Sequence, residues 1–145
     1  MSATRDAAMV RARDHIDSGA FLADLERRIA IPTESQEPSQ RQQLYRYLDD
    51  EIGPWLQRYG FVTELFENSD PMGGPYLLAT RHEDDEAPTL LTYGHGDVVR
   101  GISEQWRDGL DPWAITVEGD RWYGRGTADN KGQHSLVMAA LATVI

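Results

Sequence analysis

The stretch T-Y-G-H-G-D-V-V-R-G, from Thr92 to Gly101, is the most informative part of this chain. A second stretch, Y-G-R-G-T-A-D-N-K-G from Tyr123 to Gly132, complements it. Each begins at the end of an apolar or aromatic run typical of a strand, and each contains glycines that let the backbone turn sharply. Each also carries His or Asp, residue types that bind metal ions. Together the two stretches are typical of the site of a metal-dependent hydrolase.

His95 and Asp97 form the first candidate pair. Because alternate residues of an extended segment point to the same side, the His-x-Asp spacing can place the carboxylate beside the imidazole. A metal-bound histidine usually donates its other ring N–H to such a partner, which fixes the tautomer. The alternative is that both side chains satisfy backbone groups in a tight turn formed by Gly94 and Gly96. Taken alone, the spacing leaves both interpretations open.

Asp129 follows the glycine-rich residues 124–126 and precedes a predicted helix. One interpretation is a helix N-cap, a role for which Asn130 competes. The other is a metal ligand, because open α/β sheets collect ligands beyond the carboxyl ends of their strands. Since the His95 motif is also present, we favour the metal interpretation.

Nearby polar residues are weaker candidates. Lys131 lies in the same turn as Asp129 and is equally compatible with a solvated surface charge. His134, one turn into the predicted last helix, could approach the site, but packing against a neighbouring strand is the commoner case. His15 and His82 have charged neighbours, so we expect them at the surface.

The composition excludes several kinds of partner and site. A chain of 145 residues, 40% of them hydrophobic, can form one domain with a core. The formal net charge of −10 disfavours nucleic acids and anionic membranes as partners, because an acidic surface repels phosphate groups. The sequence contains no cysteine, so any metal must be held by His and carboxylates. No apolar run reaches the roughly 20 residues of a membrane span, and the charged N-terminus does not resemble a signal peptide, so we expect a cytoplasmic protein.

Periodicity predicts alternating helices and strands, hence a layered α/β domain. Residues 7–31 show helical spacing with a break at Ser18-Gly19, and residues 44–59 form a second helical stretch that Gly53-Pro54 can kink. Residues 132–145 predict a buried helix. The predicted strands are residues 61–66 and 76–80, a buried strand at 89–93, and a hairpin of 113–118 with 121–123 around Gly119-Asp120.

Four motifs resemble the N-terminal part of the catalytic domain of the dinuclear zinc exopeptidase and deacylase family. This family includes aminoacylase, acetylornithine deacetylase, succinyl-diaminopimelate desuccinylase and glutamate carboxypeptidase. The motifs, in family order, are I-P-T-E-S at 31–35, G-H-G-D-V-V at 94–99, W-x-x-x-x-D-P-W at 106–113 and G-R-G-T-A-D-N-K-G at 124–132. Arg100 departs from the pattern, since the family commonly has proline there, and should affect the local loop more than the metals.

The resemblance implies a zinc-exopeptidase-like sheet flanked by helices, incomplete and without the family's lid domain. It implies that His95 ligates one zinc ion, that Asp129 bridges two, and that Asp97 acts in catalysis by holding the ring of His95. The peptide bond between Asp129 and Asn130 would be cis. Two zinc ions, with cobalt or manganese as alternatives, would activate a water that attacks the amide bond of a small peptide or an N-acyl amino acid.

The family's general-base glutamate and adjacent acidic ligand have no counterpart, because residues 130–145 contain neither Asp nor Glu. We therefore interpret residues 1–145 as the N-terminal portion of a metallopeptidase catalytic domain. We expect this chain alone to bind metal weakly or not at all and to be inactive. Self-association through exposed apolar surface is also expected, because the sheet and the last helix would lack neighbours.

Two other functions remain alternatives. The chain could be a non-enzymatic binding module on the same scaffold, because a fold does not determine a function. A binuclear phosphoesterase suits the metal-binding residue types, but it does not suit the acidic surface or the order of the motifs. The sequence does not identify the substrate.

Overall fold

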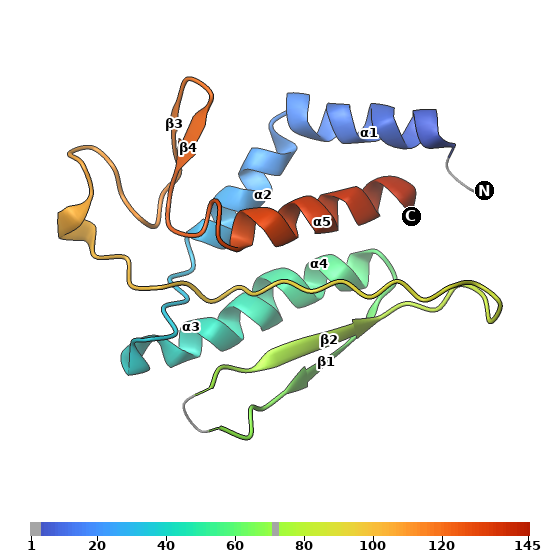
Figure 1. The fold of residues 1–145 in the computed structure, drawn as a ribbon, viewed down its shortest axis with the longest axis horizontal. Helices are drawn as coiled ribbons and strands as arrows, with labels where there is room; N and C mark the ends of the chain where they lie inside the picture. The colour runs from blue at the N-terminus through green and yellow to red at the C-terminus, as the bar shows by residue number, and fades with distance from the viewer. Residues whose placement is uncertain (1–3, 71–72) are drawn as a thin grey trace.

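Helices and small antiparallel sheets alternate along the chain in the computed structural model, which describes residues 4–70 and 73–145 (Figure 1). The predicted α/β class is confirmed. The helices are α1 (Arg5–Asp17), α2 (Ala20–Ile29), α3 (Arg41–Arg46), α4 (Gly53–Arg58) and α5 (Lys131–Val144). Shorter helical segments are η1 (Pro38–Gln40), the π-helical η2 (Tyr47–Ile52) and η3 (Ser103–Gln105). The strands are β1 (Val62–Phe66), β2 (Tyr76–Thr80), β3 (Thr116–Glu118) and β4 (Arg121–Tyr123).

The predicted break between the first two helices is confirmed at Ser18 and Gly19. Gly19 has a φ of 79°, a left-handed conformation that glycine adopts without steric cost. The turn lets α2 bury Phe21, Leu25 and Ile29 against the rest of the molecule.

The second helical stretch runs through α3, η2 and α4 and changes its winding at the predicted position. Pro54 has no N–H with which to continue the α-helical hydrogen bonds, and the π-helical η2 ends directly before Gly53. A Cβ on Gly53 would lie 3.0 Å from the carbonyl oxygen of Leu48, so a side chain at this position would crowd that carbonyl. The stretch buries Tyr47 and Trp55 in the main core.

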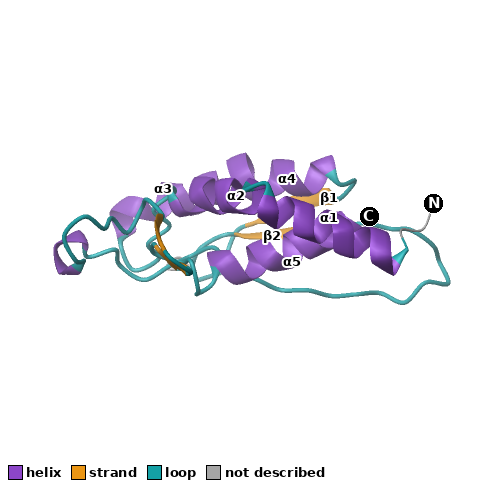
Figure 2. Ribbon diagram, turned by 90° about the horizontal axis from the view of Figure 1, so that it is seen from above, coloured by secondary structure: helices purple, strands orange, loops and turns teal. Residues whose placement is uncertain are grey.

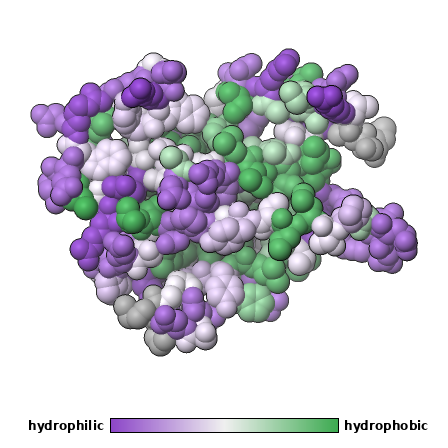
Figure 3. Space-filling view, in the orientation of Figure 1, coloured by the Kyte–Doolittle hydropathy of each residue, from purple (hydrophilic) through white to green (hydrophobic). Residues whose placement is uncertain are grey.

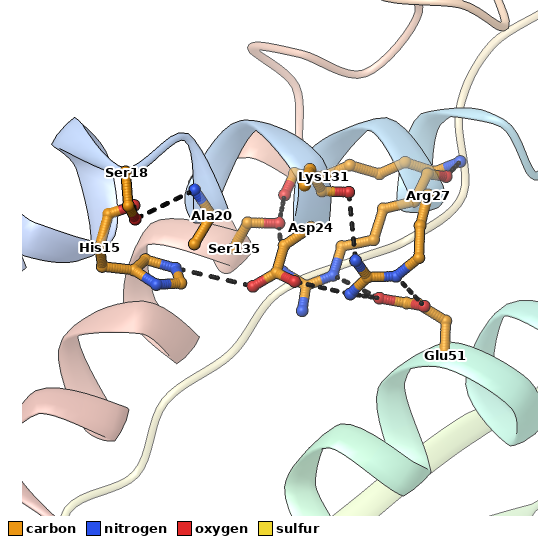
Figure 4. A network of polar contacts seen from close by, with 10 residues as sticks. His15, Ser18, Ala20, Asp24, Arg27, Glu51, Lys131 and Ser135 are labelled. Atoms are coloured by element: carbon orange, nitrogen blue, oxygen red, sulfur yellow. Dashed lines mark hydrogen bonds and ion pairs between the residues drawn. The ribbon is translucent and has the colours of Figure 1, made fainter.

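The helices are also joined by a network of charged side chains (Figure 4). Arg27 of α2 pairs with Asp24 at 2.6 Å and with Glu51 of η2 at 3.4 Å. Its neighbour Arg28 is only 1% exposed, pairs with Glu51 at 3.3 Å and donates a 2.6 Å hydrogen bond to Ser135 of α5. A buried guanidinium requires such partners, so this network fixes α5 and η2 against α2.

Each sheet is a two-stranded antiparallel pair. The strands β1 and β2 pair from Val62 opposite Thr80 to Phe66 opposite Tyr76. This hairpin contacts α4, which separates it from α2 and α5 in Figure 1. The predicted hairpin at Gly119 is confirmed, but its first strand begins at Thr116 rather than at residue 113.

The predicted buried strand at residues 89–93 is wrong. These residues form an extended segment without ladder partners among the described residues, and Leu91 and Tyr93 are 86% and 84% exposed. An apolar run becomes a buried strand only when neighbouring elements cover both of its faces, and the described chain supplies no such cover. In Figure 1 the segment passes between α5 and β2, and Figure 2 shows that it lies on one side of the helices.

The last helix is present, but it is buried on one face only, whereas the prediction was a buried helix with apolar residues on most faces. Lys131, Ser135 and Met138 face the interior, whereas Leu136 and Val144 are 54% and 57% exposed. Figure 3 shows apolar surface where α5 and the extended segment lie. No helix in the described ranges has the length and apolar character needed to cross a membrane.

Candidate metal site

The imidazole of His95 lies between two carboxylates from distant parts of the sequence. Its Nδ1 atom is 3.2 Å from Oδ1 of Asp97, and its Nε2 atom is 3.3 Å from Oδ1 of Asp129. The structure therefore brings all three predicted site residues together. Asp97 also presents its carbonyl oxygen to Nδ1 at 3.1 Å.

The proton positions on this ring decide what the arrangement can bind. The Nδ1 atom faces two acceptors of Asp97, its carbonyl oxygen and its carboxylate, so the tautomer with a proton on Nδ1 donates to Asp97. In the neutral ring, Nε2 then presents a lone pair to Asp129. Two electron-rich atoms 3.3 Å apart repel each other unless a cation lies at this position, either a proton on Nε2 or a metal ion. The donor set of one imidazole and one carboxylate thus fits a metal such as zinc.

The loop that carries His95 and Asp97 is fixed by the segment after α2. The N–H of Val98 donates to the carbonyl of Thr33 at 2.9 Å, and the N–H of Ser35 donates to the carbonyl of Val98 at 3.2 Å. The hydroxyl of Thr33 donates to the carbonyl of Gly96 at 2.5 Å. These bonds explain why I-P-T-E-S accompanies the His95 motif, because it anchors the loop.

Close packing explains the glycines on either side of His95. A Cβ on Gly94 would lie 2.4 Å from Cβ of His134, and a Cβ on Gly96 would lie 2.2 Å from Cε1 of Tyr47. Real Cβ contacts are not that short, so both positions require glycine as the side chains now stand. The glycines therefore let the loop lie directly on α5 and η2.

Asp129 does not act as a helix cap. The N-cap position of α5 is Asn130, and no side-chain hydrogen bond caps the helix there. The side chain of Asp129 is 81% exposed and faces His95 instead. The peptide bond between Asp129 and Asn130 is cis, as the resemblance implies.

Lys131 is a buried residue and not a solvated surface charge. Its ammonium donates to the carbonyls of Arg28 at 2.8 Å and Ile31 at 2.7 Å, and it lies 4.8 Å from the centre of the Tyr47 ring. Burial lowers the pKa of Lys131 to about 7, although the nearby carboxylate of Asp97 acts in the opposite direction. Lys131 therefore has a structural role, because its hydrogen bonds join α5 to the end of α2.

His134 lies close to the site, which was the less favoured of its two expected positions, and Tyr47, to which the sequence assigned no role, lies beside it. The Tyr47 hydroxyl lies 2.5 Å from Nε2 of His134, and Nδ1 of His134 lies 3.3 Å from Oδ1 of Asn130. Burial, followed by the positive charge of Arg28, lowers the pKa of His134 to about 4, and burial raises the pKa of Tyr47. The glycines at 94 and 96 were the available signal, because they indicate that something packs closely against the loop.

A cavity of about 850 Å³ adjoins the site. His95 and Asp97 line it, together with apolar residues that include Leu91, Val137 and Met138. Its size lies within the roughly 300–1,000 Å³ of small-molecule sites. Among the described residues no group of three or more His, Cys, Asp or Glu could hold a metal ion, so His95 and Asp129 are a partial ligand set.

Comparisons with known proteins show which family this chain is similar to. Residues 91–145 match peptidase family M20/M25/M40. Acetylornithine deacetylase from Pasteurella multocida is 33% identical over 123 residues, which cover 85% of this chain and 31% of that protein. Succinyl-diaminopimelate desuccinylase from Ehrlichia ruminantium is 31% identical over 90 residues, which cover 61% of this chain and 23% of the relative. The chain thus spans less than a third of the length of these relatives.

Two solved structures share the fold. Human carnosine dipeptidase 1 matches 92% of this chain with a TM-score of 0.78 and 28% identity, and the match covers 30% of that structure. The di-peptidase Dug1p from Saccharomyces cerevisiae matches 99% of this chain with a TM-score of 0.81, covering 31% of that structure. At 21% identity, the second match supports the fold alone.

Proposed function

We infer that this chain belongs to peptidase family M20/M25/M40, and we propose that it is the N-terminal portion of a metallopeptidase catalytic domain that supplies part of a dinuclear zinc site for hydrolysis of amide bonds. The substrates we propose are small peptides or N-acyl amino acids. The relatives named as deacetylase, desuccinylase and dipeptidase support this class of substrate.

The observation that carries the proposal is the position of His95 between Asp97 and Asp129. We propose that His95, through Nε2, and Asp129 are residues that would hold the zinc ions. Support comes from the 3.3 Å separation of these groups and from the lone pair that Nε2 presents to Asp129. When bound, two zinc ions would lower the pKa of a water molecule and polarise an amide carbonyl. Cobalt or manganese could replace zinc, because both accept nitrogen and oxygen ligands.

Asp97 serves as a positioning residue in this proposal. By accepting the Nδ1 proton it holds the imidazole in the tautomer that leaves Nε2 free. The same hydrogen bond makes Nε2 more basic and so a better ligand. This role is supported by the 3.2 Å contact with Nδ1.

We further propose that the 145-residue chain by itself binds zinc weakly and has no peptidase activity. A catalytic zinc usually has three protein ligands and a water, whereas His95 and Asp129 are two candidates for a pair of ions. Residues 130–145 offer no carboxylate to act as general base or further ligand. The missing groups would come from outside these residues. Submicromolar zinc binding, or turnover of a dipeptide, by the purified 145-residue chain would contradict this proposal.

The metal proposal is tested by zinc titration of the complete protein and its variants. His95→Ala and Asp129→Ala should each weaken zinc binding by at least about 100-fold, because each removes a direct ligand. His82→Ala is a matched control, since His82 is a surface histidine with a 72% exposed side chain, and its Nε2 atom lies 3.1 Å from Oδ1 of Asp85. Wild-type zinc affinity in both site variants would refute the assignment.

Activity provides the second measurement. Removal of metal by a chelator should abolish hydrolysis of N-acyl amino acids and dipeptides by the complete protein, and added zinc should restore it. Hydrolysis that persists after complete metal removal would exclude a metal-dependent mechanism. A cytoplasmic location and self-association of the isolated chain stay predictions.

A further inference from the structure

We infer that Tyr47 and His134 are positioning residues that hold the backbone of His95 through Asn130. The Tyr47 hydroxyl is 2.5 Å from Nε2 of His134, whose Nδ1 is 3.3 Å from Oδ1 of Asn130. The same oxygen of Asn130 accepts the backbone N–H of His95 at 3.1 Å. Four residues from three segments thus form one continuous hydrogen-bond chain that ends at the proposed metal ligand.

The chemistry of the four groups determines which one donates and which one accepts in each hydrogen bond. A backbone N–H can only donate, so the atom of Asn130 that faces His95 must be the carbonyl oxygen. The amide nitrogen of Asn130 agrees with this assignment, because it donates to Oε1 of Gln133 at 2.7 Å. Since Oδ1 of Asn130 only accepts, the hydrogen bond from His134 requires a proton on Nδ1. Nε2 of His134 is then the acceptor, and the Tyr47 hydroxyl is the donor.

Burial fixes the two aromatic side chains in these roles. Tyr47 is 2% exposed, and its ring packs edge-on against His134 with centroids 5.9 Å apart. Gly94 packs on the Cβ of His134, and Gly96 packs on the ring of Tyr47. The pair therefore touches the loop on both sides of His95, at positions 94 and 96, as well as reaching its N–H. Displacing either ring would release the loop from α5, the helix that Asp129 directly precedes.

The consequence for metal binding rests on the proposed function. His95 and Asp129 belong to different segments, and Asn130 is the residue that joins them, since it follows Asp129 and binds the N–H of His95. Loss of these hydrogen bonds should let His95 and Asp129 move apart. The hydrogen-bond chain itself requires no metal, so it can be tested independently.

The first test determines the His134 tautomer by nitrogen NMR of the complete, metal-free protein. The expected result is a neutral ring with the proton on Nδ1. In Tyr47→Phe, which keeps the ring and removes the hydroxyl, the Nδ1 tautomer should lose population and the His95 amide should exchange faster with solvent. Tyr45→Phe is the matched control, because it removes a hydroxyl that binds Glu67 elsewhere on the surface. A proton on Nε2 of His134 in the wild-type protein would overturn the inference.

The second test compares zinc affinity in two variants of equal shape. His134→Asn keeps an N–H donor near the position of Nδ1, whereas His134→Leu removes every donor and acceptor. Zinc affinity should fall roughly 3- to 10-fold in the Leu variant and stay within about 2-fold of wild type in the Asn variant. Melting curves of both variants show whether they are folded. If the wild type binds zinc and both folded variants bind it equally well, the positioning role is wrong. If the wild type binds no zinc, the proposed function fails, while the tautomer still decides the hydrogen-bond chain.

Discussion

Gly96 lies directly on the ring of Tyr47, so that a Cβ at this position would be 2.2 Å from the ring carbon Cε1. Tyr47 is 2% exposed and also holds His134 through its hydroxyl. The loop that presents His95 is therefore packed on a ring that has little freedom to move. This contact relates the core of the domain directly to the geometry of the candidate site.

We expect Gly96→Ala to destabilise the protein by about 1–3 kcal/mol, the usual cost of overpacking a rigid interior. The added methyl must displace either the Tyr47 ring or the His95 loop. The measurement is the free energy of unfolding in denaturant. Combining the change with Tyr47→Leu, which makes room, should cost less than the sum of the two single changes. Additive costs would show that the two residues do not interact.

Lys131 should resist amine-reactive reagents in the folded protein. It is the only lysine of the chain, and its side chain is fully buried with two carbonyl partners. Its pKa, lowered to about 7, would make an accessible amine unusually reactive, so protection would reflect burial alone. Mass spectrometry of the labelled protein should find modification at Lys131 only after denaturation. Rapid labelling under native conditions would contradict the buried position.

Acidification should destabilise the protein through His134. The unfolded residue titrates near 6.5 and the folded residue near 4, so between these pH values the unfolded chain binds more protons. Stability from this group is complete above pH 6.5 and is lost as the pH falls toward 4. The loss should be on the order of 2 kcal/mol, since the side chain is partly solvated.

The control for this pH effect is His134→Asn, which removes the titrating ring. Denaturant unfolding at several pH values should show a smaller decrease in stability below pH 6.5 in this variant than in the wild type. The charges that act on His134, those of Arg28, Lys131 and His95, are present in both proteins, so the difference between the two pH profiles reports the residue at position 134. Identical pH profiles would assign the acid sensitivity to other groups.

The sequence predicted the parts of the site that depend on local spacing. The His-x-Asp spacing predicted that Asp97 lies beside His95. The glycine-rich turn before the last helix predicted that Asp129 is a candidate ligand at the start of that helix. The position of Tyr47 was not predicted, and the approach of His134 was only the less favoured alternative, because packing between segments far apart in the sequence determines both. The prediction of a buried strand at residues 89–93 was wrong for a related reason. An apolar run is buried only if other elements of the fold pack against it, and its own sequence does not show whether they do.

The burial of Lys131 shows the same limit in the opposite direction. A lysine in a polar turn is usually solvated, and spacing gave no sign that two carbonyls at the end of α2 would receive its ammonium. Charged residues are buried only where partners compensate for the lost water, and those partners were 100 or more positions away in the sequence.

The isolated 145-residue chain should self-associate through the apolar surface around the extended segment. Leu90, Leu91 and Tyr93 are 76%, 86% and 84% exposed, and α5 adds Leu136 and Val137. Contiguous apolar surface of this kind favours association because contact removes it from water. Sedimentation at rising protein concentration should detect dimers or larger species. Leu91→Ser should shift the association to higher concentration, whereas Ile16→Ser, a change at a half-exposed apolar residue of α1, should not. If the chain stays monomeric at every concentration, this surface does not mediate self-association.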